Sequence, residues 1–148
     1  NFYYYFTDKE NLMEETLKFV HEFFLENAIK KAYDESLSPE ERLDKMLNKL
    51  EKIFLSSEGG CIMGNIALET AYTIPKLTEI VKIYFNDWIS ALKHIYKFKH
   101  DDNTSQELAE LTVQDVEGGI MLYRIYKDKT YILKALQIAR KRFKTDYI

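Results

Sequence analysis

The chain is poor in the residues that interrupt regular structure, with five glycines and two prolines among 148 residues. Glycine and proline are the strongest local breaks in helices and strands, so their scarcity predicts long elements with short connections. The single cysteine cannot form a disulfide within the chain, which fits a reducing compartment. A length of 148 residues is enough for one hydrophobic core, and we expect one folded body without disulfides.

Long apolar runs and a basic charge balance are also missing. No uninterrupted apolar stretch approaches the roughly 18 to 20 residues of a membrane-spanning helix, and no basic-then-apolar leader is present. We therefore expect a soluble, cytoplasmic protein that does not contact membranes. The net charge of −3 does not supply the basic field with which a free-standing nucleic-acid binder neutralises phosphates.

Apolar residues recur at helical spacing along the chain, and no stretch shows the two-residue period of a strand. Capping boxes mark helix starts at Thr7, Ser38 and Thr104, and Pro75 opens a further helix. The expected helices span about residues 7–33, 38–55, 60–72, 75–98, 104–126 and 131–144. The sequence therefore predicts an all-α fold of about six helices.

Signatures of catalysis are absent from the sequence. None of the three histidines belongs to a Glu-x-x-His pair, which argues against a di-iron bundle. The segment GGCIMG lacks the lysine and the spacing of a phosphate-binding loop. Cys61 has no histidine near it in sequence, and is better explained as a small buried residue than as a thiol sensor. We therefore predict that the protein is not an enzyme and holds no metal or other cofactor.

The opening segment FYYYFTDKENL carries the most specific pattern in the chain. It resembles the end of the recognition helix and the start of the next helix in TetR-family transcriptional repressors. The matching positions are Phe2, Tyr3, Tyr5, Phe6, Lys9, Glu10 and Leu12. Further along, GCIMGNIALE, FNDW and VEGGIMLYRIYKDKTYILKAL are similar to patterns of one large TetR subgroup. The resemblance implies that residues 1–6 end a DNA-recognition helix and that residues 7–148 form an effector-binding and dimerisation domain.

The same resemblance implies that Tyr3, Tyr5 and Lys9 contact DNA phosphates, which position a protein on DNA without reading its sequence. Aromatic packing between two helices is the alternative explanation of this segment. We expect the base-reading residues to lie in a preceding helix-turn-helix that this chain lacks, so that operator DNA is bound through that segment.

The helix expected at residues 104–126 has two apolar stripes, which predicts two packing partners. We expect one stripe to pack in its own domain and the other, with the last helix, to build a four-helix bundle in a homodimer. The alternative is that both stripes are internal core. The predicted dimer residues are Leu111, Asp115, Gly118, Gly119, Leu122, Tyr126, Leu133 and Leu136. Asp115 lies within an apolar arc, where it meets a basic group of the last helix across the dimer, faces the ligand, or marks a boundary.

Helical projection also predicts a pocket for an unknown apolar or aromatic small molecule. The candidate lining residues are Phe23, Phe54, Met63, Asn65, Glu69, Tyr84, Trp88 and Tyr123. Asp87 and His94 are expected at a cavity edge or at the rim of the core. The basic cluster near the C-terminus, which includes Arg140 and Arg142, is expected to be a solvated face.

The predicted function is that of a ligand-responsive transcriptional regulator, with a repressor as the expected type. In this hypothesis, a bound small molecule shifts the first helix and the DNA-binding domains attached to it. The alternative is an all-α protein-interaction or dimerisation module with a filled core and no ligand.

Overall fold

The computed structural model describes residues 8–145, and within them every regular element is helical. The elements are α2 (Lys9–Asn27), the 3₁₀ helix η1 (Ile29–Tyr33), α3 (Pro39–Leu55), α4 (Ile62–Thr70), α5 (Pro75–Tyr96), α6 (Asp102–Tyr126) and α7 (Thr130–Lys144). The predicted all-α class is therefore confirmed. The described part of the chain contains no helix that is long and apolar enough to cross a membrane.

Helix starts agree with the sequence at α3 and differ at α2 and α6. Ser38 caps α3: its hydroxyl accepts from the Glu41 amide at 3.3 Å, while the Glu41 carboxylate accepts from the Ser38 amide at 2.8 Å. Asp8 caps α2 by accepting from an amide one turn later, and Thr7 lies outside the described residues. The expected cap at Thr104 is wrong.

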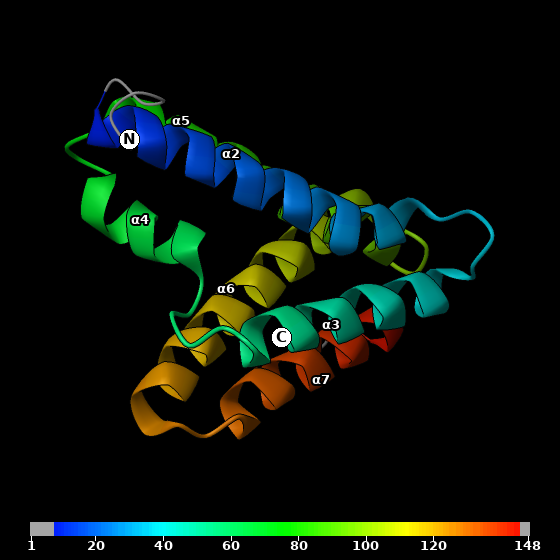
Figure 1. The fold of residues 1–148 in the computed structure, drawn as a ribbon. Helices are drawn as coiled ribbons and strands as arrows, with labels where there is room; N and C mark the ends of the chain where they lie inside the picture. The colour runs from blue at the N-terminus through cyan, green and yellow to red at the C-terminus, as the bar shows by residue number, and fades with distance from the viewer. Residues whose placement is uncertain (1–7, 146–148) are drawn as a thin grey trace.

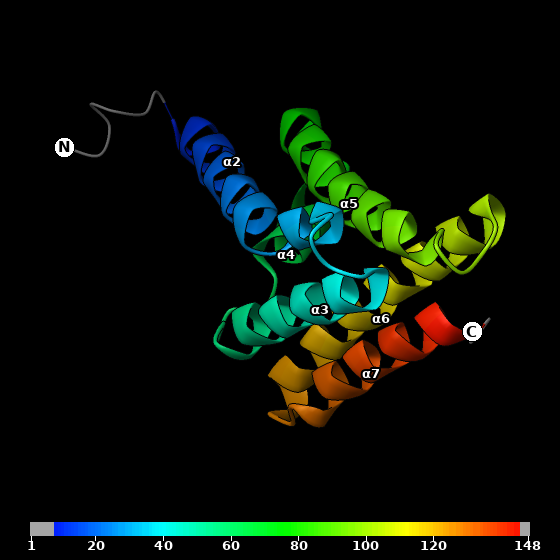
Figure 2. The same ribbon diagram turned by 90° about the vertical axis from the view of Figure 1, so that its right-hand side faces the viewer.

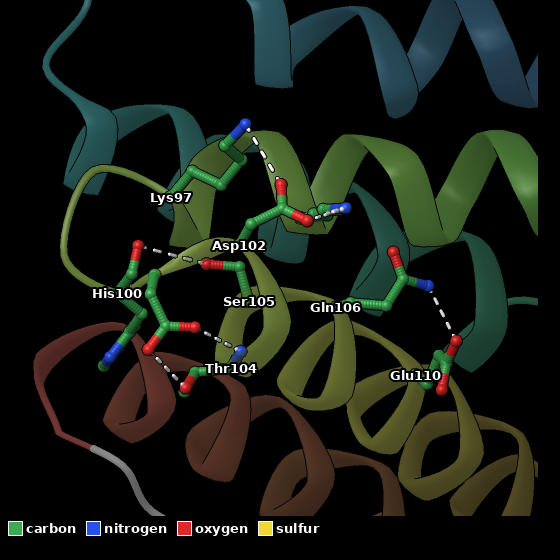
Figure 3. Close-up of polar contacts among 9 residues, drawn as sticks. Lys97, His100, Asp102, Thr104, Ser105, Gln106 and Glu110 are labelled. Carbon is green, nitrogen blue, oxygen red and sulfur yellow. Dashed lines mark hydrogen bonds and ion pairs between the residues drawn. The ribbon is translucent and has the colours of Figure 1, made fainter.

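Asp101, three residues earlier, caps α6 and accepts from the amide of Thr104 at 2.8 Å. A carboxylate is a stronger acceptor than a hydroxyl and is favoured by the helix dipole, so the helix starts there. Figure 3 shows the junction of α5 and α6, where Asp102 forms ion pairs with Lys93 at 3.0 Å and with Lys97 at 3.2 Å. These contacts hold the turn between the two helices.

The first helix is shorter than expected, because it ends at Asn27 instead of continuing to Tyr33. The Asn27 side chain donates to the carbonyl of Phe23 at 2.8 Å, and the backbone leaves α-helical geometry at Ala28. Asparagine side chains compete with backbone hydrogen bonds in this way near helix ends. The chain continues as η1, which buries Ile29 and packs against α3 and α5.

The helices form two groups around a shared core. Figure 2 shows α3, α6 and α7 stacked below α2 and α5, while α4 lies at one end of α5 in Figure 1. α5 packs against α2, α4 and α6, and α6 packs against α7. The largest fully buried side chains include Tyr84, Trp88 and Tyr96 of α5, so this helix is the centre of the hydrophobic core.

The basic C-terminal cluster is not a uniformly solvated face, which corrects the sequence-based expectation. The Arg142 side chain is 3% exposed and forms an ion pair with Asp115 of the same chain at 2.7 Å. It also donates to the Thr112 hydroxyl at 3.1 Å, and the Tyr96 hydroxyl lies 3.0 Å from that same oxygen. A buried guanidinium needs such partners because burial removes its hydration.

Candidate functional site

Three cavities meet at the loop before α4, and Gly60 lines all of them. Gly60 has φ +76°, a left-handed backbone conformation that is natural for glycine and strained for other residues. The cavities have volumes of about 480, 380 and 150 Å³ and are called here the first, second and third cavity. Together they place a hollow region beside α2, α3, α4, α5 and α6.

The first cavity lies between the C-terminal ends of α3 and α6. Its apolar wall includes Phe54, Ile120 and Tyr123. Its charged lining residues are Glu58, Arg124 and Lys127. The Tyr123 hydroxyl donates to the carbonyl of Leu55 at 3.4 Å, which connects α6 to the end of α3. This cavity offers both an aromatic wall and charged groups at its edge.

The second cavity lies between α4, α5 and α6, and its wall is mostly apolar. The lining residues are Gly60, Cys61, Gly64, Asn65, Ala67, Leu68, Phe85, Glu117, Gly118, Ile120, Met121 and Arg124. Glu117 is the one carboxylic acid among them. Burial raises the pKa of Glu117 to about 7, and a hydrogen bond with the Cys61 side chain opposes that shift. Glu117 is therefore only partly ionised near neutral pH.

Gly64 makes room for the Glu117 carboxyl group. A Cβ atom built on Gly64 would lie 2.6 Å from Oε2 of Glu117, closer than real Cβ contacts. Cys61 lies on the same wall, and burial together with the Glu117 charge raises the pKa of its thiol. Burial likewise raises the pKa of the Tyr84 phenol well above its usual value. The Cys61 thiol and the Tyr84 phenol therefore stay neutral near pH 7.

The third cavity connects this region to α2. Val20, Phe23 and Phe24 of α2 line it, opposite Met63 of α4 and Tyr84 of α5. The Phe24 ring lies 4.5 Å from the Tyr84 ring between centroids. A group that entered the third cavity would therefore contact α2 directly.

The predicted pocket residues separate into three groups. The first group lines these cavities and consists of Phe23, Phe54, Met63, Asn65, Tyr84 and Tyr123. Trp88 lies behind them in the core, where its ring stacks on Phe54 and Phe85. Glu69 is exposed on α4 and lines none of the three cavities.

Glu117 lines the second cavity but is not among the pocket residues that helical projection selected. Gly64 is the relevant signal, since its missing side chain leaves space for the Glu117 carboxyl group. Gly64 lies on another helix, so no spacing within the sequence could have paired the two. Only the tertiary structure, which places Gly64 of α4 against Glu117 of α6, brings them together.

Two polar contacts tie α2 to α5. His21 Nε2 lies 2.7 Å from a carboxylate oxygen of Asp87, and Glu14 forms an ion pair with Lys76. Asp87 thus faces α2 rather than standing alone at a cavity edge. His94 packs instead on the rings of Tyr33 and Phe98, outside the three cavities.

The predicted dimer residues differ in how much surface they offer. Tyr126 is exposed, and Leu111, Asp115, Gly118, Leu122 and Leu133 are half-buried. Leu136 is buried within the chain, and so is Gly119, where an added Cβ would lie 2.9 Å from the carbonyl oxygen of Tyr131. Gly119 thus permits close contact between α6 and α7 of one chain, and Asp115 meets its basic partner, Arg142, in the same chain.

Lys9 is exposed at the start of α2, whereas Tyr3 and Tyr5 lie outside the described residues, as does the boundary expected after residue 6. Across residues 8–145, no group of three or more His, Cys, Asp or Glu side chains is placed to hold a metal ion.

Comparison with known proteins identifies the family. The family described as "Transcriptional regulator LmrA/YxaF-like, C-terminal domain" matches residues 39–138. The uncharacterized HTH-type transcriptional regulator YxaF of Bacillus subtilis is 28% identical over 135 residues, which cover 88% of this chain and 70% of that protein.

A crystal structure of a TetR transcriptional regulator from Legionella pneumophila shares the fold, with a TM-score of 0.85 and 23% identity over 95% of this chain and 77% of that chain. The fold is therefore TetR-like. Because the family match covers more than half of the sequence, the chain belongs to the TetR family of transcriptional regulators, a non-enzymatic family, and contains its LmrA/YxaF-like C-terminal domain.

Proposed function

We propose that this chain is the ligand-sensing and dimerisation part of a TetR-type regulator, in which a small apolar or aromatic molecule controls DNA binding. The observation that carries the proposal is the position of α2, which lines the third cavity through Phe23 and Phe24 and begins at Lys9. One helix thus extends from the hollow region to the residue expected near DNA.

The cavity sizes support a small-molecule ligand. The first and second cavities, at about 480 and 380 Å³, are within the range of ligand pockets, and the third, at about 150 Å³, is too small for a whole drug-sized ligand. A ligand in the larger cavities that extends into the third must displace Phe23, Phe24 or Tyr84. Such a ligand binds better to a conformation in which α2 has moved, and it shifts the population toward that conformation.

DNA recognition is assigned to an HTH-type segment of the kind named in the description of the Bacillus subtilis relative. We assign Tyr3, Tyr5 and Lys9 to phosphate contacts beside it. In a protein that carries such a segment, Lys9→Ala should weaken binding to a random-sequence duplex and reduce the salt slope by about one. Lys30→Ala, at an exposed position beyond the end of α2, is the matched control.

Dimerisation through α6 and α7 completes the proposal, with Leu111, Leu122, Tyr126 and Leu133 as surface-accessible members of the interface. A dimer would set the spacing of two DNA-binding heads, so a change in α2 would alter how both heads meet one operator.

A ligand screen distinguishes a sensor from an interaction module with a filled core. Trp88 is the one tryptophan of the chain and stacks on Phe54 and Phe85, which line the cavities, so its fluorescence reports on them. Hydrophobic drugs, organic acids and lipids should be tested by thermal shift together with Trp88 emission. A ligand at about 100 times its Kd should raise Tm by roughly 5 to 10 °C. A library in which no compound changes either signal contradicts the sensor function.

A further inference from the structure

Within residues 8–145, two buried side-chain polar atoms have no hydrogen-bond partner: Nε1 of Trp88 and Oε1 of Glu117. An indole N–H that is buried without a partner lowers the stability of the fold by a modest amount of free energy. A carboxyl oxygen is different, because an ionised carboxylate loses far more hydration on burial than a neutral group does. Glu117 is therefore the most unusual polar group in the described part of the chain.

Glu117 lies on the wall of the second cavity, where most of the other lining side chains are uncharged. Phe85, Leu68 and Met121 are apolar, and the Cys61 thiol and the Tyr84 phenol stay uncharged near neutral pH because burial raises their pKa values. Arg124 lines the same cavity two helical turns away, but within the described chain it forms no ion pair with Glu117. The cavity thus holds one acidic group and no cation bound to it.

We propose that Glu117 anchors a protonated organic amine with an apolar body in the second cavity. The ammonium group would donate to Oε1 of Glu117, and the apolar body would pack on Phe85, Leu68 and Met121. This inference rests on the proposed ligand-sensing function and adds to it the chemical class of the ligand.

The chemistry favours an amine over other donors. A neutral alcohol can donate a hydrogen bond to Glu117 but leaves the buried charge uncompensated. A protonated amine supplies both a donor and the opposite charge, so it also compensates the buried carboxylate, which an alcohol does not. A carboxylate ligand places two like charges together and should be excluded. The expected order of affinity is therefore amine, then alcohol, then acid.

Three matched probes test this order: naphthylmethylamine, naphthylmethanol and naphthoate share one apolar body and differ in charge. Isothermal titration should show the amine binding about tenfold more tightly than the alcohol, and the acid not binding at the second cavity. Glu117→Gln should abolish the preference for the amine, while binding of the alcohol should be retained. Glu110→Gln, at an exposed position of the same helix, is the matched control and should keep the preference.

Proton release provides a second readout that needs no variant. An ammonium group beside Glu117 favours the carboxylate, so amine binding at pH 7 should release protons from a group whose pKa is about 7. Titrations in phosphate and in Tris, which differ in ionisation enthalpy, should give different binding enthalpies for the amine and equal ones for the alcohol. Equal enthalpies for the amine would overturn the anchor role of Glu117.

The outcomes separate this inference from the proposed function. If amine and alcohol bind equally to the wild type, or if Glu117→Gln keeps the preference, the amine anchor is wrong and a ligand-binding cavity remains. If none of the probes binds and the wider screen also finds no ligand, both proposals are wrong. A preference that is lost in Glu117→Gln and kept in Glu110→Gln supports both.

Discussion

His21 of α2 and Asp87 of α5 lie 2.7 Å apart, between Nε2 of the imidazole and a carboxylate oxygen. The contact joins the helix that lines the third cavity to the central helix of the core. It therefore helps to fix the position of α2 on the core.

Asp87→Asn should lower the free energy of unfolding by about 1 kcal/mol, because it weakens a charge-assisted contact at a partly exposed site. The same variant should increase amide hydrogen exchange in α2 more than in α7. Glu22→Gln, at an exposed position beside His21, should change neither quantity. Uniform exchange across all helices would contradict a specific role of this contact in holding α2.

Glu117 should make the protein less stable as pH rises. Its pKa is about 7 when folded and close to the ordinary value of 4.5 when unfolded, so the folded state binds more protons between these pH values. The stabilisation is fully present below pH 4.5 and is lost as pH rises through about 7. The loss is on the order of 3 kcal/mol.

Urea denaturation of wild type and Glu117→Gln from pH 5 to pH 8 measures this difference. Because the substituted amide does not ionise, the free energy of unfolding of the variant should decline less as pH rises. The variant should therefore be more stable than the wild type near pH 8. Parallel curves for the two proteins would show that Glu117 does not titrate as its burial predicts. Glu110→Gln should reproduce the wild-type curve.

The adjacent glycines of α6 should respond oppositely to alanine. A Cβ at Gly119 would lie 2.9 Å from the Tyr131 carbonyl oxygen, so α7 must move, at a cost of about 1 to 3 kcal/mol. A Cβ at Gly118 meets nothing within 4 Å, and alanine there should stabilise the helix by up to about 1 kcal/mol. Thermal unfolding of both variants checks the prediction, which fails if Gly119→Ala is as stable as Gly118→Ala.

Leu122→Glu should dissociate a dimer built on α6 and α7, because it places a charge on a half-buried apolar position of the proposed interface. Light scattering at micromolar concentration should show a dimeric wild type and a monomeric variant with unchanged circular dichroism. Tyr72→Glu, at a fully exposed position outside that interface, should remain dimeric. A monomeric wild type would contradict the interface itself.

Much of the local structure could be predicted from residue types alone. The Ser38–Glu41 capping box, with Pro39 after the cap, sets the start of α3 through contacts three residues apart. The apolar spacing in α5 likewise predicts which face is buried, and Leu77, Val81, Tyr84 and Trp88 lie in the core. The α6 cap was missed because the Thr104–Glu107 spacing also fits a capping box, although the Asp101 carboxylate is the stronger cap.

The sequence by itself determined the helical class, the order of the helices and the family, because these depend on short-range spacing and on residue types. Only the tertiary structure decided the roles of Glu117, Gly119 and Arg142, because their partners come from other helices. The physical reason is burial: a carboxyl group on a helix is ordinary in water and acquires a raised pKa only when a neighbouring helix removes the water around it.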